Sequence, residues 1–350
     1  METYDAGMGR HDVALVGAGP IGIEMAVALK RAGIDYIHFD AGQIGATIQW
    51  FAPQTRFFSS NERIAIAGVP LVTADQSKAS REEYLAYLRA VTMQFDLSIR
   101  TFERVVDVKR LRDGFELVSE RRGERRTTVA KKVIFATGGT DRPRKLGIPG
   151  EDLPHVSSYF QDPHTYFRQM LLIVGGKNSA AEAALRCHHA GARVAISYRR
   201  DSLPEKSIKY WLWPELKGLM DSGRIEAHLP TVPVSITPTH VRLRHLVDGR
   251  EYTVEADFVL SLIGYEQDNT LLRRAGIELV GEQLAPRFDE RTMQTNVSGL
   301  FVIGTATAGT QSGYRVFIEN CHVHVERVMA SLLERRVSEL PEPKYDRPES

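Results

Sequence analysis

The order of apolar and polar segments near the N-terminus is typical of a strand, a helix and a second strand. Residues 12–16 form a short apolar run that ends in glycines, residues 21–32 carry apolar side chains at helical spacing, and residues 36–39 are apolar again. The same order returns in residues 170–174, 180–190 and 193–198. Because helical spacing predicts a helix and a short apolar run beside glycines predicts a buried strand, we expect two βαβ units.

Each expected βαβ unit is followed by segments in which polar and apolar residues alternate. These segments are residues 105–110, 115–120 and 127–131 in the first half of the chain, and residues 234–255 in the second. Each then leads into an apolar run that ends in glycine, at residues 133–138 and 258–264. Alternation predicts small antiparallel meanders, so the two halves share one plan.

A further apolar run at residues 299–304 and a long amphipathic segment at residues 315–335 remain after the second half is complete. Insertion of the second domain into the first accounts for them. The predicted fold class is therefore α/β, with two Rossmann-like, three-layer dinucleotide-binding domains, one inserted into the other. The expected boundaries are 1–153 and 267–335 for the outer domain, 154–266 for the inserted domain, and 336–350 for a charged, flexible tail.

Length and composition exclude some classes of function. A chain of 350 residues exceeds the usual size of one domain, and its 43% hydrophobic and 25% charged residues are typical of a globular protein. Its net charge of +1 gives no overall field that would attract nucleic acid or an anionic membrane. No apolar run approaches the roughly 18 residues that span a bilayer. We expect a cytoplasmic protein with neither kind of partner.

The two cysteines, Cys187 and Cys321, lie far apart in the sequence. They form no CxxC pair, no zinc-ligand spacing and no disulfide framework, so we expect no metal site. Both lie in segments expected to be helical, where a buried structural cysteine is a more ordinary interpretation than a redox-active one.

Gly17, Gly19 and Gly22 form a GxGxxG motif between the first expected strand and helix, and Asp40 ends the next strand. In this context the first glycine permits a tight turn, the second lets the backbone approach a pyrophosphate, and the third lets the helix pack on the strand. The helix N-terminus attracts negative charge. Asp40 would accept from a ribose hydroxyl and repel a 2′-phosphate, so this site favours FAD or NAD.

The corresponding turn of the second half is Gly175-Gly176-Lys177-Asn178-Ser179-Ala180, in which Lys177 replaces the middle glycine. Arg199 and Arg200 stand where the first half has its acid, and two arginines suit the 2′-phosphate of NADP. The alternative interpretation is a solvated basic turn. Two dinucleotide sites of opposite preference suggest a hydride relay from NADPH through a flavin to an acceptor, which is oxidoreductase chemistry.

Several motifs resemble flavoproteins of known families. GAGPIG at residues 17–22, FATGG at 135–139, IPGE at 148–151 and TNVSGLFVIG at 295–304 resemble the thioredoxin reductase type. FFSS at 57–60, PGEDLP at 149–154, VGGKNSA at 174–180, SIK at 207–209 and FIEN at 317–320 resemble the bacilliredoxin reductase (bacillithiol disulfide reductase, YpdA-like) family. The resemblance covers residues 12 to about 333. It implies FAD in the outer domain, NADPH in the inserted domain, and a homodimer.

The resemblance also implies which residues hold each cofactor. For FAD they are Gly17, Gly19, Pro20, Ile21, Gly22, Asp40, Gln49, Val105, Thr137, Gly138, Gly304 and Thr305. For NADPH they are Gly176, Lys177, Asn178, Ser179, Arg199, Arg200, Ser207, Lys209 and Gly264.

The sequence departs from both families where thiol chemistry would occur. Thioredoxin reductases carry a CxxC dithiol in the stretch that here reads HVSSYFQD at residues 155–162, without cysteine. Bacilliredoxin reductases typically have a cysteine after the proline of the first turn, where this chain has Ile21. No thiolate can form there, so disulfide attack from that position is excluded. Thr305 also replaces an aspartate that usually contacts the flavin.

Some aromatic and histidine residues have two interpretations. Trp50, Phe57 and Phe58 either line a flavin or substrate pocket or pack in the core. His322 and His324 are either proton donors near the flavin or surface and capping residues.

The sequence thus predicts an NADPH-dependent FAD oxidoreductase that passes electrons to an acceptor without a protein thiol. The acceptor stays open: a low-molecular-weight disulfide or bacilliredoxin, a quinone, a ferredoxin-type protein, or oxygen, the last including monooxygenase chemistry. The rival class is a non-catalytic flavin-binding sensor or subunit.

Overall fold

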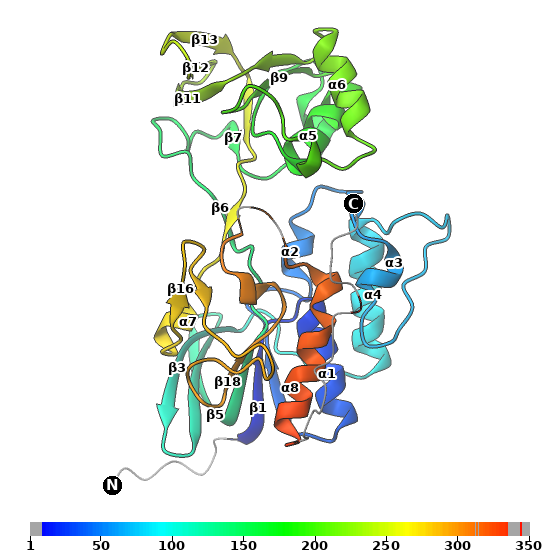
Figure 1. Cartoon of the computed structure of the whole chain (residues 1–350), viewed down its shortest axis with the longest axis vertical. Helices are drawn as coiled ribbons and strands as arrows, with labels where there is room; N and C mark the ends of the chain where they lie inside the picture. The colour runs from blue at the N-terminus through cyan, green and yellow to red at the C-terminus, as the bar shows by residue number, and fades with distance from the viewer. Residues whose placement is uncertain (1–8, 312, 314, 335–343, 345–350) are drawn as a thin grey trace. The chain divides into compact units, whose positions relative to one another are not determined.

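The structure, a computed structural model, describes residues 9–311, 313, 315–334 and 344, and divides into two compact units (Figure 1). Within the described residues, unit 1 comprises 9–49, 54–142 and 266 onward, and unit 2 comprises 50–53 and 143–265. Unit 2 is therefore inserted in the sequence of unit 1, and the fold is the predicted two-domain α/β fold. Apart from Lys344, the expected tail at 336–350 lies outside the described residues.

Unit 1 contains a six-stranded sheet whose central strand is β5 (Glu124–Phe135). β1 (Arg10–Val16), β2 (Tyr36–Phe39) and β18 (Leu300–Val302) form the parallel part with β5. β4 (Gly114–Arg121) and β3 (Arg104–Leu111) continue the sheet as an antiparallel meander. The parallel and antiparallel parts thus share one strand.

The continuity of β5 differs from the expectation of two separate strands at residues 127–131 and 133–138. Lys131 and Lys132 interrupt the apolar pattern, but the backbone ladder continues through them, with Ala130 paired to β4 and Val133 to β18. Their long side chains reach solvent from a paired backbone, so the change in hydropathy does not mark a strand end.

Alternate residues of β1 enter different cores on the two faces of the sheet. Val13 and Leu15 pack with the helices, whereas Ala14 and Val16 pack with the meander and the helix α7 (Thr270–Arg274). Because side chains alternate along a strand, an uninterrupted apolar run buries both faces. This arrangement produces the three layers of unit 1.

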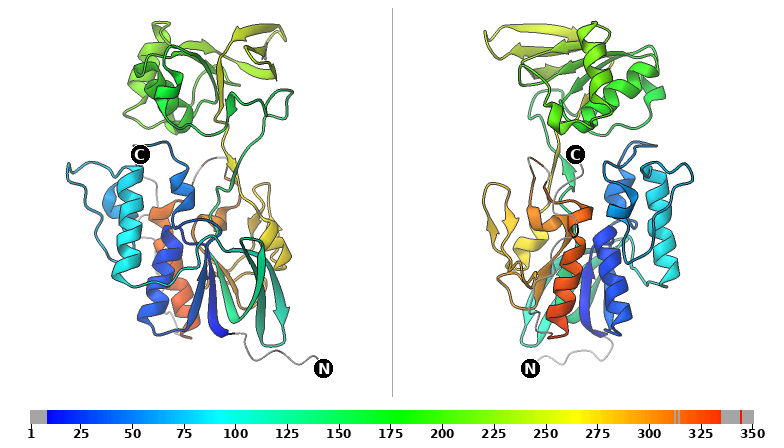
Figure 2. Two further views of the ribbon diagram at one scale, coloured as in Figure 1. Left: turned by 180° about the vertical axis from the view of Figure 1, so that it is seen from behind. Right: turned by 45° about the vertical axis from the view of Figure 1, so that its right-hand side comes forward.

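Three helices cover one face of the unit 1 sheet, as Figures 1 and 2 show: α1 (Pro20–Arg31), α4 (Arg81–Gln94) and α8 (His322–Leu332). A capping box of Ser80 and Glu83 begins α4. α8 is shorter than the amphipathic segment expected at 315–335, because a 3₁₀ turn (Ile318–Asn320) precedes it.

The remaining elements of unit 1 are short. They are α2 (Ala46–Gln49), α3 (Asn61–Ile64), β16 (Leu279–Val280), β17 (Ala285–Pro286) and the 3₁₀ turn Gly304–Ala308.

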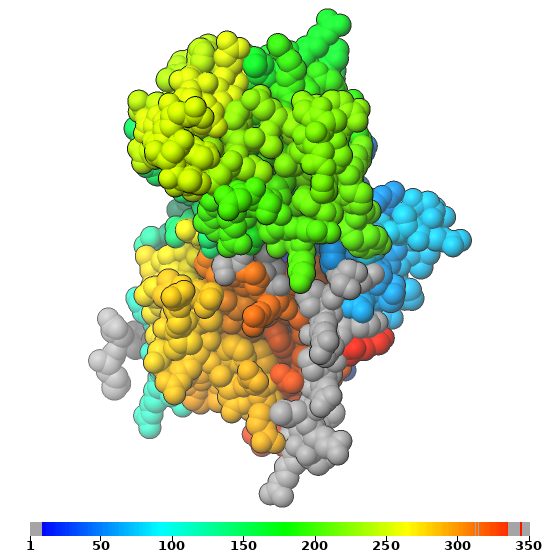
Figure 3. Space-filling model, turned by 45° about the horizontal axis from the view of Figure 1, so that its top comes forward, coloured from blue at the N-terminus to red at the C-terminus, as the bar shows by residue number. Residues whose placement is uncertain are grey.

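Unit 2 contains a parallel five-stranded sheet of order β10-β9-β8-β14-β7. Its strands are β10 (Glu226–His228), β9 (Arg193–Ser197), β8 (Met170–Val174), β14 (Phe258–Ser261) and β7 (Val156–Ser157). The helices are α5 (Asn178–His189) and α6 (Trp213–Asp221), with 3₁₀ turns at Pro163–Tyr166 and Glu205–Ser207. An antiparallel meander of β11 (Thr231–Ile236), β12 (His240–His245) and β13 (Glu251–Glu255) lies at the surface of unit 2 (yellow-green in Figure 3).

The two links between the units form a short ribbon, in which β6 (Arg142–Pro143) pairs with β15 (Tyr265–Glu266). The first division therefore lies at 142/143, whereas the sequence placed it at 153/154. The reason is that Leu146, Ile148 and Leu153 pack on a core of unit 2. None of the helices in the described part of the chain reaches the length and apolar character that a membrane crossing requires.

Candidate functional site

In unit 1 the carboxyl ends of the parallel strands meet at one edge of the sheet. β1 leads into Gly17, β2 into Asp40, β5 into Ala136 and Thr137, and β18 into Ile303 and Gly304. In open α/β sheets ligands bind at this edge. The structure thus brings together loop segments that lie far apart in the sequence.

The glycine turn between β1 and α1 is held by close backbone contacts. A Cβ on Gly17, whose φ is 111°, would lie 2.3 Å from the carbonyl oxygen of Ala136. A Cβ on Gly22 would lie 2.0 Å from the carbonyl oxygen of Gly17. A Cβ on Gly19 would meet nothing within 4 Å, and no side chain caps the helix there. The open side of the turn is therefore at Gly19, followed by Pro20 in the first turn of α1.

Asp40 is tied to this turn by backbone hydrogen bonds. The N–H groups of Ala18 and Gly42 donate to its two carboxylate oxygens at 2.5 and 2.7 Å. Burial raises the pKa of Asp40, and the two N–H donors offset part of that rise. A carboxylate has about four acceptor positions, so each oxygen can accept one further donor such as a ribose hydroxyl.

His38 is a residue of this site that the sequence reasoning missed. Its side chain is fully buried in β2, and its Nε2 lies 2.9 Å from the carbonyl oxygen of Gly17. Because a carbonyl only accepts, Nε2 carries the proton. Burial lowers the pKa of His38 to about 4, so the imidazole is neutral at pH 7. A polar residue inside the apolar run YIHF was the available signal.

Ile21 and Gly304 are neighbours at the site. Ile21 is buried in the helical core, and a Cβ on Gly304 would lie 3.4 Å from the Cβ of Ile21. The N–H of Gly304 donates to Nδ1 of His324 at 3.1 Å, and Thr307 Oγ1 donates to the Gly304 carbonyl at 2.8 Å. Burial, with the nearby Arg327, lowers the pKa of His324 to about 4. His324 is therefore a neutral acceptor that holds this turn.

His322 lies elsewhere on α8 and pairs with a carboxylate. Its Nδ1 is 2.7 Å from Glu24 Oε2, and its Nε2 is 3.0 Å from the carbonyl oxygen of Arg63. Burial opposes protonation, but the hydrogen bond and the charge of Glu24 outweigh it and raise the pKa of His322. It links α1 to α8 and α3.

The other residues implied for FAD lie around this edge. Gly138 has a φ of 82°, and a Cβ at this position would reach only Thr305 Oγ1, at 4.0 Å. Gln49 is exposed at the end of α2. Val105 is buried in β3, two residues after Glu103, whose N–H donates to the carbonyl oxygen of Asp40 at 2.9 Å.

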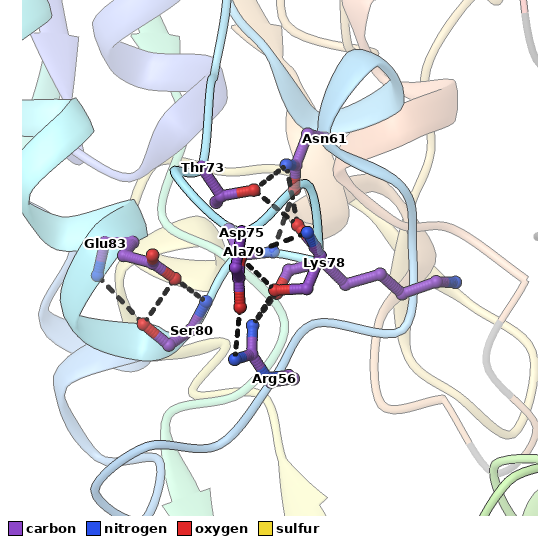
Figure 4. A network of polar contacts seen from close by, with 9 residues as sticks. Arg56, Asn61, Thr73, Asp75, Lys78, Ala79, Ser80 and Glu83 are labelled. Atoms are coloured by element: carbon purple, nitrogen blue, oxygen red, sulfur yellow. Dashed lines mark hydrogen bonds and ion pairs between the residues drawn. The ribbon is translucent and has the colours of Figure 1, made fainter.

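The loop that carries the FFSS motif is fixed by a polar network (Figure 4). Arg56 donates to the carbonyl oxygen of Lys78 at 2.6 Å and to Asp75 at 3.1 Å, and Asn61 accepts from Ala79 N–H at 2.8 Å. The core interpretation is confirmed for Phe57, whose ring centroid lies 4.6 Å from that of the buried Tyr84. The other two aromatic residues differ from Phe57. The Phe58 ring lies beneath the Lys78 ammonium, and Trp50 is exposed.

Unit 2 repeats the glycine turn with two substitutions. A Cβ on Gly175, whose φ is 147°, would lie 2.5 Å from the Leu262 carbonyl oxygen, as Gly17 meets Ala136 in unit 1. Ala180 takes the place of the third glycine, and Lys177 is the N-cap of α5. A Cβ on Gly176 would lie 2.6 Å from the Tyr198 ring, so this glycine makes room for an aromatic side chain.

Lys209 and Asn178 meet at the start of α5. Asn178 Oδ1 accepts from the Lys209 N–H at 2.6 Å, and the Lys209 ammonium donates to Glu182 at 2.8 Å. This ammonium is buried and paired with a carboxylate, so its main visible role is to fix the segment after Ser207 against α5. The other implied residues, Ser179 and Gly264 (φ 98°), lie after β8 and β14 at the carboxyl edge of the sheet.

Arg199 and Arg200 follow β9 at the same edge and line a pocket of about 530 Å³. Both are exposed, and neither forms an ion pair with any acid in the described part of the chain. Burial lowers the pKa of Lys177, and the charges of Arg199 and Arg200 lower it further. Three cations therefore lie close enough to repel one another, which favours an anionic ligand.

Both cysteines are completely buried. Burial raises the pKa of Cys187 to about 12 and raises the pKa of Cys321 as well. Neither thiol is ionised at neutral pH, which supports the structural interpretation.

A family model described as pyridine nucleotide-disulphide oxidoreductase matches residues 14–304, which include both glycine turns. The chain belongs to this family. Bacilliredoxin reductase Bdr of Bacillus subtilis (strain 168) is 35% identical to this oxidoreductase, over 92% of the chain and 97% of the relative. The resemblance found in the sequence is thereby confirmed.

Two further proteins are similar to the chain over most of its length. The structure of bacillithiol disulfide reductase Bdr (YpdA) from Bacillus cereus has a TM-score of 0.88 at 32% identity, covering 94% of this oxidoreductase and all (100%) of that chain. A ferredoxin–NADP reductase of Ignicoccus hospitalis is 28% identical, over 85% of this oxidoreductase and 90% of the relative.

FAD and NADPH are the cofactors that go with this family, as the sequence predicted. The residues present fit both groups. The turn of unit 1 is open at Gly19 and has an acid with spare acceptor positions, and the pocket of unit 2 has two arginines without a carboxylate partner among the described residues.

The two glycines of the unit 1 turn should respond differently to alanine. Gly22→Ala forces a Cβ onto a backbone oxygen, so we expect it to lower the free energy of unfolding by about 2–5 kcal/mol. Gly19→Ala adds a methyl group in open space at a φ of −73° and should change it by less than about 1 kcal/mol. Urea unfolding of both variants checks this. Equal losses would contradict the described packing.

His38 should make the stability of unit 1 depend on pH. Its folded pKa of about 4 lies below the unfolded value of 6.5, so the unfolded state binds more protons as the pH falls below 6.5, and stability is lost down to about pH 4. His38→Gln keeps a donor for Gly17 but cannot titrate. Between pH 7 and 5 we expect this variant to lose about 2 kcal/mol less stability than the parent.

Urea unfolding at each pH measures this difference, and His164→Gln, at an exposed position, serves as the control that should follow the parent curve. Parallel curves for His38→Gln and the parent would refute the assignment. His324 titrates in the same window and leaves part of the slope in place.

Proposed function

We propose that this chain is an NADPH-dependent flavin reductase, in which a hydride passes from NADPH to FAD and its electrons go on to an acceptor without a protein thiol. The observation that carries this proposal is the contrast between two similar turns. One has a half-buried acid, Asp40, and the other has exposed cations, Arg199 and Arg200. The acid suits a ribose without a 2′-phosphate, and the cations suit a ribose with one.

In unit 1 we assign the pyrophosphate of FAD to the turn at Gly17, Gly19, Pro20 and Gly22. Support comes from the open space at Gly19 and from the uncapped start of α1, where backbone N–H groups favour an anion. Asp40 is held for a ribose hydroxyl by its two amide donors. The loops after β5 and β18, with Thr137, Gly138, Gly304 and Thr305, would lie along the rest of the cofactor.

In unit 2 we assign the pyrophosphate of NADPH to the start of α5 and the 2′-phosphate to Arg199 and Arg200. Lys177 at the N-cap adds a cation where the consensus turn has a glycine. Lys209 supports this turn through Asn178 and Glu182. Its part is therefore to position the loop, while the exposed arginines recognise the phosphate.

The residues at three positions support electron transfer without a protein thiol. Ile21 stands where the bacilliredoxin reductase resemblance leads us to expect cysteine, and its side chain packs against the Gly304 turn. Cys187 and Cys321 are buried thiols with raised pKa values. Reduction of a disulfide through a protein thiolate is thus unsupported, and direct transfer from the flavin is the remaining route.

A ferredoxin-type acceptor is a second candidate, favoured by the same Ile21, because transfer of single electrons needs no thiol. Relatives named ferredoxin–NADP reductase cover most of the chain. A low-molecular-weight disulfide, bacilliredoxin, a quinone or oxygen stays as an alternative acceptor, and a non-catalytic flavin sensor stays as the rival class. The homodimer and the cytoplasmic location also stay predictions.

The hydride step can be tested on purified protein loaded with FAD. On anaerobic mixing with NADPH we expect the flavin absorbance near 450 nm to bleach, because a hydride reduces the flavin before any acceptor is present. A flavin that stays oxidised would refute the reductase and leave the sensor. Adding ferredoxin, a disulfide, a quinone or oxygen separately then identifies what restores the absorbance.

The assignment of the 2′-phosphate predicts a loss of selectivity in Arg200→Ala. A charge-assisted hydrogen bond contributes about 1.5–3 kcal/mol, so the variant should bind NADPH at least about tenfold more weakly while its affinity for NADH is nearly unchanged. Titration calorimetry measures both. Arg193→Ala, at the opposite end of β9, is a matched control that should bind like the parent. Equal losses for both nucleotides would contradict the assignment.

A further inference from the structure

The pocket beside Arg199 and Arg200 has an apolar wall that the glycine motif does not predict. The loop after β9 contributes both arginines, Asp201, Ser202 and Pro204 to the lining, and the remaining lining residues are Pro230, Leu246 and Val247. Leu246 and Val247 lie in the turn between β12 and β13. The pocket thus combines charged and polar groups with apolar side chains, and all of its lining residues belong to unit 2.

The apolar wall is exposed and yet held in place. Leu246 and Val247 retain 47% and 77% of their accessible surface, which is unusual for two adjacent aliphatic residues in a turn. The N–H of Leu246 donates to the carbonyl oxygen of Pro230 at 3.0 Å, and the N–H of Gly249 donates to that of His245 at 3.0 Å. His245 Nδ1 also lies 2.9 Å from Asp248. These bonds fix the turn beside the end of β9.

We propose that Leu246 and Val247 form the surface on which the adenine ring of NADPH lies, in the same pocket as the arginines that take its 2′-phosphate. This inference rests on the proposed function. An adenine ring has two flat apolar faces and a polar rim, so a site needs an apolar wall for one face and polar groups at the edge. The β12–β13 turn supplies the first and the loop after β9 the second, and a volume of about 530 Å³ suffices for the base and its ribose.

The β12–β13 turn is therefore a specificity element for the adenosine half of the cofactor, although it lies outside the βαβ unit. Val247 and Leu246 act by contact area and do not distinguish NADPH from NADH. Arg200 makes that distinction through charge. Substitutions in the β12–β13 turn should therefore weaken the binding of NADPH and NADH equally, whereas Arg200→Ala should weaken mainly the binding of NADPH.

The test uses the full-length protein with FAD bound and the double variant Leu246→Ala/Val247→Ala. We expect it to bind adenosine 2′,5′-bisphosphate and NADPH about five- to tenfold more weakly than the parent, and NADH by the same factor, because apolar area is lost from the wall. Binding of reduced nicotinamide mononucleotide, which lacks adenosine, should not change. Val72→Ala/Val280→Ala, at exposed valines of unit 1, is the control that should bind like the parent.

A second variant reports on the contact itself. In Val247→Trp, adenosine 2′,5′-bisphosphate should quench the added indole fluorescence by stacking on it, whereas the indole of Val72→Trp should not respond. Parent-like affinity of the double variant, together with an indole in Val247→Trp that does not respond to the ligand, would overturn the inference.

The outcomes also separate this inference from the proposed function. If the parent protein binds neither NADPH nor adenosine 2′,5′-bisphosphate, the proposed function fails. Another outcome is that the parent binds both and Arg200→Ala loses its selectivity for NADPH, while the double variant and Val247→Trp behave like the parent. Only the assignment of the adenine wall then fails. In that case the turn would be free for another role, such as contact with a protein partner.

Discussion

The backbone contact between Gly17 and Gly22 is the constraint on which the rest of unit 1 depends. With the Gly17 carbonyl oxygen 2.0 Å from where a Cβ of Gly22 would be, α1 can start beside the end of β1 only if the third glycine position of the motif has no side chain. That same carbonyl accepts from the buried His38, and the next amide, of Ala18, donates to Asp40. A single turn thus fixes the helix, the second strand and the acid at the sheet edge.

Unit 2 meets the same backbone constraint with different chemistry. Gly175 stands as close to the Leu262 carbonyl as Gly17 stands to that of Ala136, so the first glycine of the motif is required by packing in both units. In unit 2 the third position of the motif is Ala180, and the middle position is Lys177, the N-cap of α5. Packing thus imposes the same first glycine in both units, whereas the charged residues beside the two turns differ.

Much of this arrangement could be predicted from the sequence, because glycine motifs and short apolar runs are local signals. The order of strands and helices, the insertion and the charged residues at both edges follow from them. Other features depend on contacts between distant segments. β5 runs through Lys131 and Lys132 because its partners β4 and β18 pair on both sides of them, and Leu153 joins unit 2 because an apolar core lies there. His38 was missed because its partner is a backbone oxygen 21 residues away.

The insertion of unit 2 also determines which of the two sheets can be completed first while the chain is being synthesised. The unit 2 sheet has its last strand once β14 (Phe258–Ser261) has been made, whereas β5 of unit 1 must wait for β18 (Leu300–Val302), which lies on the far side of the insertion. At about 5–20 residues per second, the interval between the synthesis of β5 and that of β18 is on the order of ten to thirty seconds. During it the ribosome-bound chain presents an unpaired, fully apolar strand edge at Val133, Ile134 and Phe135, which is the kind of segment that chaperones bind.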